Sequence, residues 1–90
     1  MTAKQVLIEW LVQHKSERIY YHDIEKVIVQ FGEDFYGKIH NVGNYSRAFR
    51  TIKEGSQPDL KEKGIELIED PSEGRAMRWV IAECEVENVD

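Results

Sequence analysis

The sequence predicts an α+β fold, with helices in the first part of the chain and a two-stranded β-hairpin near its end. Three observations predict it. Apolar residues recur at the spacing of amphipathic helices, β-prone segments flank a turn sequence further on, and 90 residues that are 41% hydrophobic and 32% charged can bury one modest core. No repeat or low-complexity tract divides the chain. We therefore expect one domain over residues 1–82 and an acidic tail over residues 83–90.

The first helix is expected over residues 3–15, with Thr2 as its N-cap. Its apolar stripe follows the spacing i, i+3, i+4, i+7, i+8, i+11 and consists of Ala3, Val6, Leu7, Trp10, Leu11 and His14. Ile8 and Val12 lie beside this stripe, one turn apart. Two interpretations remain open for them: they widen the core face, or, together with Trp10, they form the contact of a homodimer.

A short strand and a second helix are expected next. The strand covers Arg18–Tyr21, which is β-prone. The helix opens at His22 or Asp23, and Gly32 is suited to cap its C-terminus. Its apolar positions, again at helical spacing, are Ile24, Val27, Ile28 and Phe31.

The third helix follows a connector over Glu33–Gly43 that contains two glycines. Apolar side chains in the connector predict that it packs against the domain: Phe35, Tyr36 and Ile39. We expect Asn44 to cap the third helix, which begins near Tyr45 and ends by Gly55. Its apolar stripe is Tyr45, Ala48, Phe49 and Ile52.

The hairpin is expected after one further helical turn over Asp59–Lys63. Ile65–Glu69 forms the first strand, Asp70–Gly74 the turn and Arg75–Ile81 the return strand. Alternation along the return strand directs one set of side chains to the core: Met77, Trp79 and Ile81. The other set, which includes Arg78, points away from it.

This order of elements resembles the winged helix-turn-helix family over about residues 2 to 82. The resemblance is a pattern of elements and includes no diagnostic short motif. It implies a three-helix core with the hairpin as a wing, and pairing of the strand after the first helix with that hairpin. The third helix, at about residues 44–54, would be the recognition helix. The chain departs from compact family members in its long 33–43 connector and in the 55–64 insertion before the wing.

Basic residues gather around the third helix in an otherwise acidic chain. No acidic residue occurs between Asp34 and Glu54. The resemblance implies that Arg47 and Arg50 face DNA bases, since arginine can donate two hydrogen bonds to guanine. The side chains expected to hold phosphates are Lys38, Asn44, Ser46 and Lys53. The alternative is that these are ordinary solvated charges on an amphipathic helix.

The resemblance implies that the wing brings Arg75 and Arg78 into contact with DNA, because arginine is favoured at phosphates and in the minor groove. The same hairpin also carries four acids, namely Glu66, Glu69, Asp70 and Glu73. Cross-strand ion pairs with these acids are therefore the alternative role of the two arginines.

The chemistry of an enzyme is not evident in the sequence. The single cysteine, Cys84, stands between Glu83 and Glu85, which disfavour a thiolate. The histidines are too scattered to suggest a metal site, and no glycine-rich phosphate loop is present. We therefore expect no catalytic activity, no cofactor and no metal.

No apolar run approaches the roughly 18 residues of a membrane span, and Glu9 and Gln13 interrupt the apolar residues of a possible signal peptide. We expect a cytoplasmic protein of a microbe or virus that does not contact a membrane.

The net charge of −5 disfavours nucleic acid, but four of the 17 acids lie in the last eight residues. The function predicted is double-stranded DNA binding, as a small transcriptional regulator or a phage or plasmid accessory factor. The alternative is a protein–protein interaction module, or a small viral inhibitor, that uses the acidic wing and tail to bind a basic partner.

Overall fold

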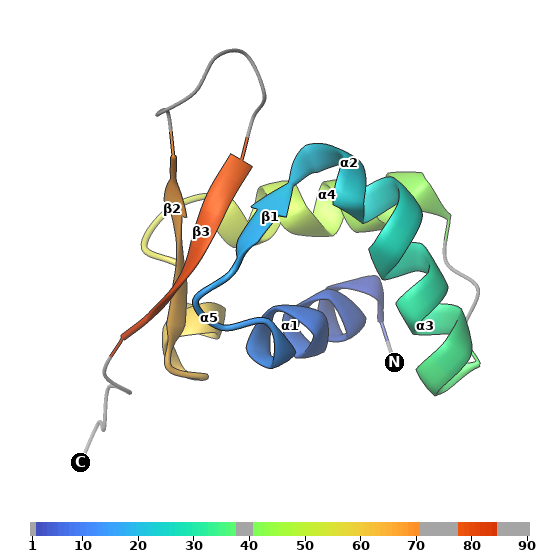
Figure 1. Cartoon of the computed structure of the whole chain (residues 1–90), viewed down its shortest axis with the longest axis horizontal. Coiled ribbons are helices and arrows are strands. Elements are labelled where there is room, and N and C mark those ends of the chain that lie inside the picture. Colours follow the sequence, from blue (N-terminus) through green and yellow to red (C-terminus); the bar gives the residue numbers. More distant parts are fainter. Residues whose placement is uncertain (1, 38–40, 71–77, 85–90) are drawn as a thin grey trace.

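The computed structural model of the chain describes residues 2–37, 41–70 and 78–84. Helices pack on one face of a three-stranded antiparallel sheet (Figure 1). The elements are α1 (Ala3–Gln13), β1 (Arg18–Tyr20), α2 (Tyr21–Asp23), the π-helical turn η1 (Ile24–Ile28), α3 (Val29–Tyr36), α4 (Val42–Lys53), α5 (Pro58–Lys61), β2 (Ile65–Glu69) and β3 (Arg78–Glu83). The predicted α+β class is confirmed.

The sheet has the order β1-β3-β2, so the strand that follows the first helix pairs with the last strand. Trp79 lies opposite Ile19 on one side and Glu69 on the other. Trp79 and Ile81 are buried beneath the helices, as predicted. The predicted turn at 71–74, together with Met77, lies outside the described residues.

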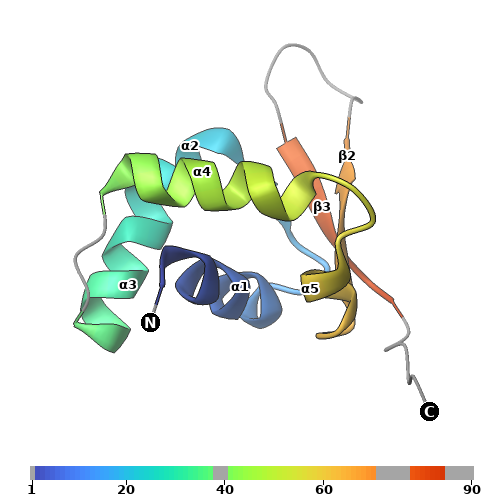
Figure 2. The same ribbon diagram turned by 180° about the vertical axis from the view of Figure 1, so that it is seen from behind.

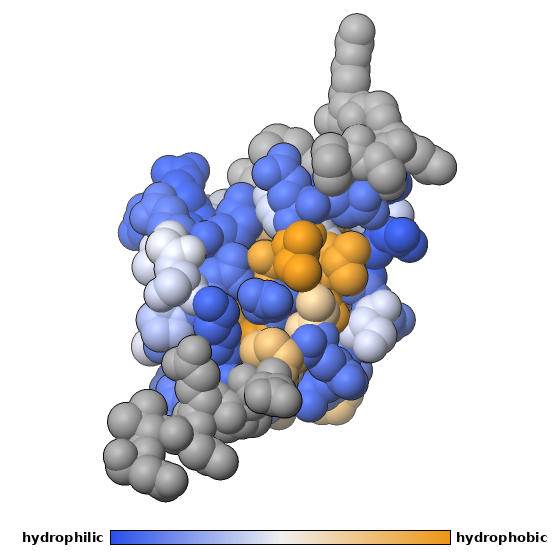
Figure 3. Space-filling model, turned by 90° about the vertical axis from the view of Figure 1, so that its left-hand side faces the viewer, coloured by the Kyte–Doolittle hydropathy of each residue, from blue (hydrophilic) through white to orange (hydrophobic). Residues whose placement is uncertain are grey.

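The outer face of the sheet is not covered by any of the described helices. Ile68 is 49% exposed there, and it lies opposite the half-buried Val80. Ala82, next on the same face of β3, is also half-buried. Figure 3 shows an apolar patch on this side of the molecule, surrounded by hydrophilic residues.

Helix α1 begins as the sequence predicts. The Thr2 hydroxyl accepts a hydrogen bond from Gln5 N, and the Gln5 side chain accepts one from Thr2 N, which completes a capping box. Trp10 is only 6% exposed, while Ile8 and Val12 pack against the core. The core-widening interpretation therefore fits Ile8 and Val12, and the homodimer contact suggested for these three residues stays a prediction.

The second helix is longer than predicted, because α2, η1 and α3 follow one another without a break from Tyr21 to Tyr36. The Asp23 carboxylate accepts a hydrogen bond from Tyr20 N, which fixes the start of the helix. Gly32 was expected to end the helix, but it lies inside it and is buried. The left-handed C-cap is Gly37, at φ 60°.

The π-helical turn alters the predicted core face of this helix. Ile24, Ile28 and Phe31 are buried as expected, but Val27 is 44% exposed. A turn of this kind is wider than an α-helical turn, so it shifts the phase of the side chains that follow the α-helical spacing. Phe35, which was expected to pack down, is 70% exposed.

Helix α4 begins three residues earlier than predicted. Asn41, not Asn44, is the N-cap, and its side-chain oxygen accepts a hydrogen bond of 2.8 Å from Asn44 N. The helix buries Tyr45, Phe49 and Ile52 and packs on α1. Figure 2 shows α4 crossing the molecule above α1.

Gln57 connects the segment after α4 to the free edge of β2. Its Nε2 donates to the carbonyl of Leu67 at 3.0 Å, and its Oε1 accepts from the amide of Leu67 at 2.7 Å. The side chain thus makes the two bonds that a neighbouring strand would make there. The backbone of Gln57 is left-handed, at φ 55°.

Candidate nucleic-acid interface on α4

Arg47 and Arg50 are exposed on the side of α4 that faces away from the core. Within residues 2–37, 41–70 and 78–84, the ion pairs involve other bases, namely Lys4, Arg18, His22 and Arg78. Neither guanidinium group is therefore paired with a carboxylate in this part of the chain. This is the arrangement that binding to an anionic partner requires.

The N-terminal turn of α4 is less suited to phosphate than the sequence suggested. The amide of Asn44 is already bonded to the Asn41 cap. Because the helix starts at Val42, Ser46 lies in the second turn, beyond the amides that lack intrahelical partners. Both side chains are half-buried.

Lys53 is held by the protein's own aromatic rings. Its Nζ lies 4.0 Å from the centroid of the Trp79 ring and 4.6 Å from that of Phe49. The two rings meet edge to face at 4.8 Å. Burial lowers the pKa of Lys53, and Arg50 lowers it further, while Glu69 and Glu54 act in the opposite direction. This cation–π contact differs from the free phosphate contact that was predicted.

A cleft of about 400 Å³ opens between the C-terminal end of α4 and the sheet. Its lining combines the bases Arg50 and Lys53 with the acids Glu54 and Glu69. The mixture of charges means that this end of α4 attracts a polyanion less strongly than the middle of the helix, where Arg47 lies.

A second groove, of about 480 Å³, separates α4 from the start of α1. Arg47 and Lys4 both line it. Sequence reasoning did not identify Lys4, because only the packing of α1 on α4 brings it beside Arg47. The ammonium of Lys4 lies 2.6 Å from Asp59, so part of its charge is compensated.

Arg78 is not placed for contact with a ligand. It is 9% exposed, and its Nε lies 3.4 Å from Asp70 Oδ2, which also accepts a hydrogen bond of 3.0 Å from Arg18 Nε. The physical reason is the sheet order, since β1 brings Tyr20 opposite Arg78. The cross-strand interpretation therefore applies to Arg78, and the DNA contact predicted for it is withdrawn.

Two predicted contacts, Lys38 and Arg75, lie outside the described residues, as does most of the acidic tail. Among the residues that are described, no three His, Cys, Asp or Glu side chains gather as metal ligands. In the same part of the chain, no helix has the length and apolar character to cross a bilayer.

Comparison with known proteins identifies no relative, since no protein-family model, curated protein or solved structure matches the chain. The fold and the surface of α4 are therefore the basis for any functional conclusion.

Proposed function

We propose that this domain binds double-stranded DNA as a winged helix-turn-helix protein, with α4 in the major groove and Arg47 and Arg50 directed to base edges. The observation that carries the proposal is the pair of exposed arginines on one helix, with no ion pair to a described carboxylate. A small transcriptional regulator or a phage or plasmid accessory factor is the role that fits a domain of this size.

The fold supports this proposal through the order of its elements. A helix, a short strand, a longer helix, the further helix α4 and the short helix α5 precede two strands, and the sheet order is β1-β3-β2. Apart from α5, a winged-helix protein has the same order, and the helix that corresponds to α4 is the one it uses for recognition. The buried face of α4 fixes the helix on the domain, so its opposite face is presented rigidly.

The number of available cations sets the expected strength of binding. Arg47 and Arg50 are the two exposed charges on α4, so the logarithm of the binding constant would fall with that of salt concentration with a slope of about −2. A bidentate arginine–guanine contact adds roughly 1–3 kcal/mol of discrimination between bases. We therefore expect modest affinity that disappears at high salt.

The test is fluorescence anisotropy of a labelled random duplex across a series of salt concentrations. Replacing Arg47 and Arg50 with alanine should abolish binding at low salt. The matched control is the Lys15→Ala, Lys63→Ala double variant, which removes the same charge from exposed positions outside α4 and should retain most of the affinity. Equal losses in the two double variants would reject α4 as the interface, and wild-type protein that ignores duplex DNA at low salt would reject the function.

The second candidate is a protein–protein interaction module for a basic partner. The observation that favours it is the net charge of −5, together with Glu54 and Glu69 in the cleft beside α4. Here the acidic groups, not the arginines, would make the contact. Replacement of Glu83, Glu85 and Glu87 with glutamine would weaken capture of a basic partner and leave any DNA binding intact or stronger.

A further inference from the structure

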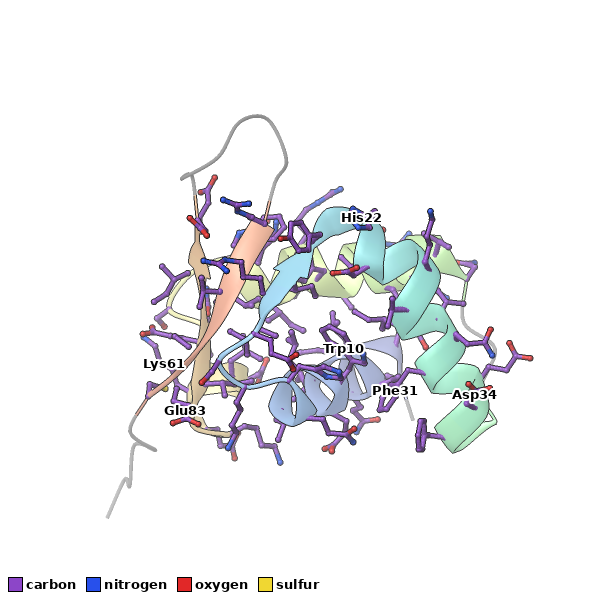
Figure 4. All side chains as sticks on the ribbon, in the orientation of Figure 1. Trp10, His22, Phe31, Asp34, Lys61 and Glu83 are labelled. Carbon is purple, nitrogen blue, oxygen red and sulfur yellow. The ribbon has the colours of Figure 1, made fainter. Side chains whose placement is uncertain are left out.

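Two rows of side chains run side by side along the continuous helix that α2, η1 and α3 form. One row, at i, i+4 and i+8, is polar: Lys26, Gln30 and Asp34. The adjacent row, with the same spacing, is apolar: Val27, Phe31 and Phe35. Both rows line a groove of about 480 Å³ between this helix and α1. Figure 4 shows Trp10, Phe31 and Asp34 on this side of the molecule.

The apolar row is unusually open. Val27 is 44% exposed and Phe35 70%, and they are two of the four large hydrophobic side chains that are exposed in the described part of the chain. The Phe31 ring lies 4.9 Å from that of Phe35, so the exposed surface continues inward to a buried aromatic group. Val27 reaches the groove because of the π-helical turn, a feature that is frequent at functional sites. Single exposed apolar residues are ordinary, but two in one row, with Phe31 between them and all three lining the same groove, indicate a contact surface.

The polar row shows what kind of partner fits. Lys26 and Asp34 are both exposed, and neither forms an ion pair with another described residue. Gln30, between them, donates to Asp34 at 2.8 Å. The two charges are eight residues apart, about 12 Å along the helix, with opposite signs at the two ends of the row.

We propose that a second copy of the chain covers this groove and forms a two-fold dimer in which the two α3 helices run antiparallel. A two-fold axis near Gln30 brings Lys26 of each copy opposite Asp34 of the other. It also lays the two apolar rows against each other. In a two-fold interface, each contact between two different residues occurs twice, once in each direction. A row with Lys26 at one end and Asp34 at the other satisfies this rule, because both contacts then join opposite charges. A uniformly charged partner would be repelled at one end.

This dimer does not rest on DNA binding. No residue of α4 lines the groove, so Arg47 and Arg50 remain open in the dimer. The surface also differs from the one that the sequence suggested on α1, because Trp10 contributes to the floor of the groove, whereas Ile8 and Val12 do not line it.

The test is sedimentation velocity of the full chain from micromolar to millimolar concentration. Lys26→Asp and Asp34→Lys should each weaken self-association about tenfold or more, because each places like charges opposite one another at both ends of the interface. The Lys26→Asp, Asp34→Lys double variant re-creates the opposite pairs and should associate nearly as well as wild type. Phe35→Ser should abolish association.

The matched control is Ile68→Ser, which removes an exposed apolar side chain from the outer face of the sheet and should leave association unchanged. Lys26, Asp34, Phe35 and Ile68 are exposed, and circular dichroism would verify that each variant is folded. Three results would overturn the proposal: a wild-type monomer at every concentration, a double variant as weak as the single ones, or loss of association in Ile68→Ser. If the groove binds a different molecule instead, the wild-type chain should remain a monomer, which is the first of these results.

Discussion

Gly32 lies against the hydroxyl group of Tyr45, so closely that a Cβ atom on Gly32 would overlap the hydroxyl oxygen. The same Cβ would be 3.3 Å from Val6 Cγ1 and an ordinary 3.5 Å from Tyr45 Cζ. Glycine is therefore favoured at this position mainly because of the Tyr45 hydroxyl, and to a lesser degree because of Val6.

We predict that Gly32→Ala destabilises the protein by about 1–3 kcal/mol through overpacking, although alanine in a helix interior is otherwise favoured over glycine by about 1 kcal/mol. Tyr45→Phe removes the overlapping atom, so the Gly32→Ala, Tyr45→Phe double variant should be more stable than the Gly32→Ala single variant. Urea unfolding of the four proteins measures the coupling. Additive effects would show that the hydroxyl is not the source of the strain.

The burial of Tyr45 also leads us to predict that the free energy of unfolding falls at alkaline pH. Burial raises the pKa of Tyr45 above its ordinary value of 10.0. The folded protein therefore favours the protonated phenol, and stability falls as pH rises from 10.0 towards the raised pKa. Lys53 acts in the opposite sense, because its lowered pKa favours folding as pH rises.

Comparison of wild type with Tyr45→Phe separates these two contributions, since Lys53 is present in both. The difference in urea midpoint between the two proteins should be constant from pH 7 to about pH 9 and then shift in favour of Tyr45→Phe. A difference that stays constant to pH 11 would contradict the prediction.

Asp70 contacts both Arg18 and Arg78, and the two ion pairs should contribute unequally to stability. Arg78 is 9% exposed, whereas the Arg18 side chain is 57% exposed. We predict that Asp70→Asn costs about 3 kcal/mol, because it removes a carboxylate that faces the buried guanidinium of Arg78. Arg18→Ala should cost less than about 1 kcal/mol, as for other surface pairs. Equal costs in urea unfolding would show that the burial of Arg78 has no energetic consequence.

Replacement of Lys53 and replacement of Arg50 should differ in their effect on DNA affinity. Lys53→Met loses a cation–π contact worth about 0.5–1 kcal/mol but also removes the charge whose burial lowers the Lys53 pKa, so it should cost less than about 1 kcal/mol of stability and reduce DNA affinity little. Arg50→Ala should leave stability within about 0.5 kcal/mol and weaken DNA binding. Unfolding and anisotropy on the same samples measure both quantities. The reverse pattern would exchange the roles assigned to the two residues.

Local patterns predicted much of the fold. The capping of α1 by Thr2, the strand Ile65–Glu69 and the buried stripe of α4 depend on neighbours in sequence, and the structure confirms all three. The predicted C-terminus of the second helix was wrong, because Gly32 was interpreted from the local preference of glycine for helix caps. Its real constraint is the contact with Tyr45, 13 residues away in the chain, which no local pattern indicates.

The candidate site was predicted less completely, for the same reason. Exposure of Arg47 and Arg50 follows from the periodicity of one helix. The position of Lys53 over Trp79 and the burial of Arg78 depend instead on how the sheet meets α4 and on the pairing of β1 with β3. Arg18 and Asp70 are 52 residues apart, and their contact exists only in the folded sheet.

The amide of Gln57 has a consequence for the behaviour of the protein in concentrated solution. An open strand edge is a template on which other chains can add and grow into fibres. By occupying the amide and carbonyl of Leu67, Gln57 closes the middle of that edge with a single side chain. We therefore expect replacement of this residue to make the domain more prone to aggregate, because it leaves the amide and carbonyl of Leu67 open at the strand edge.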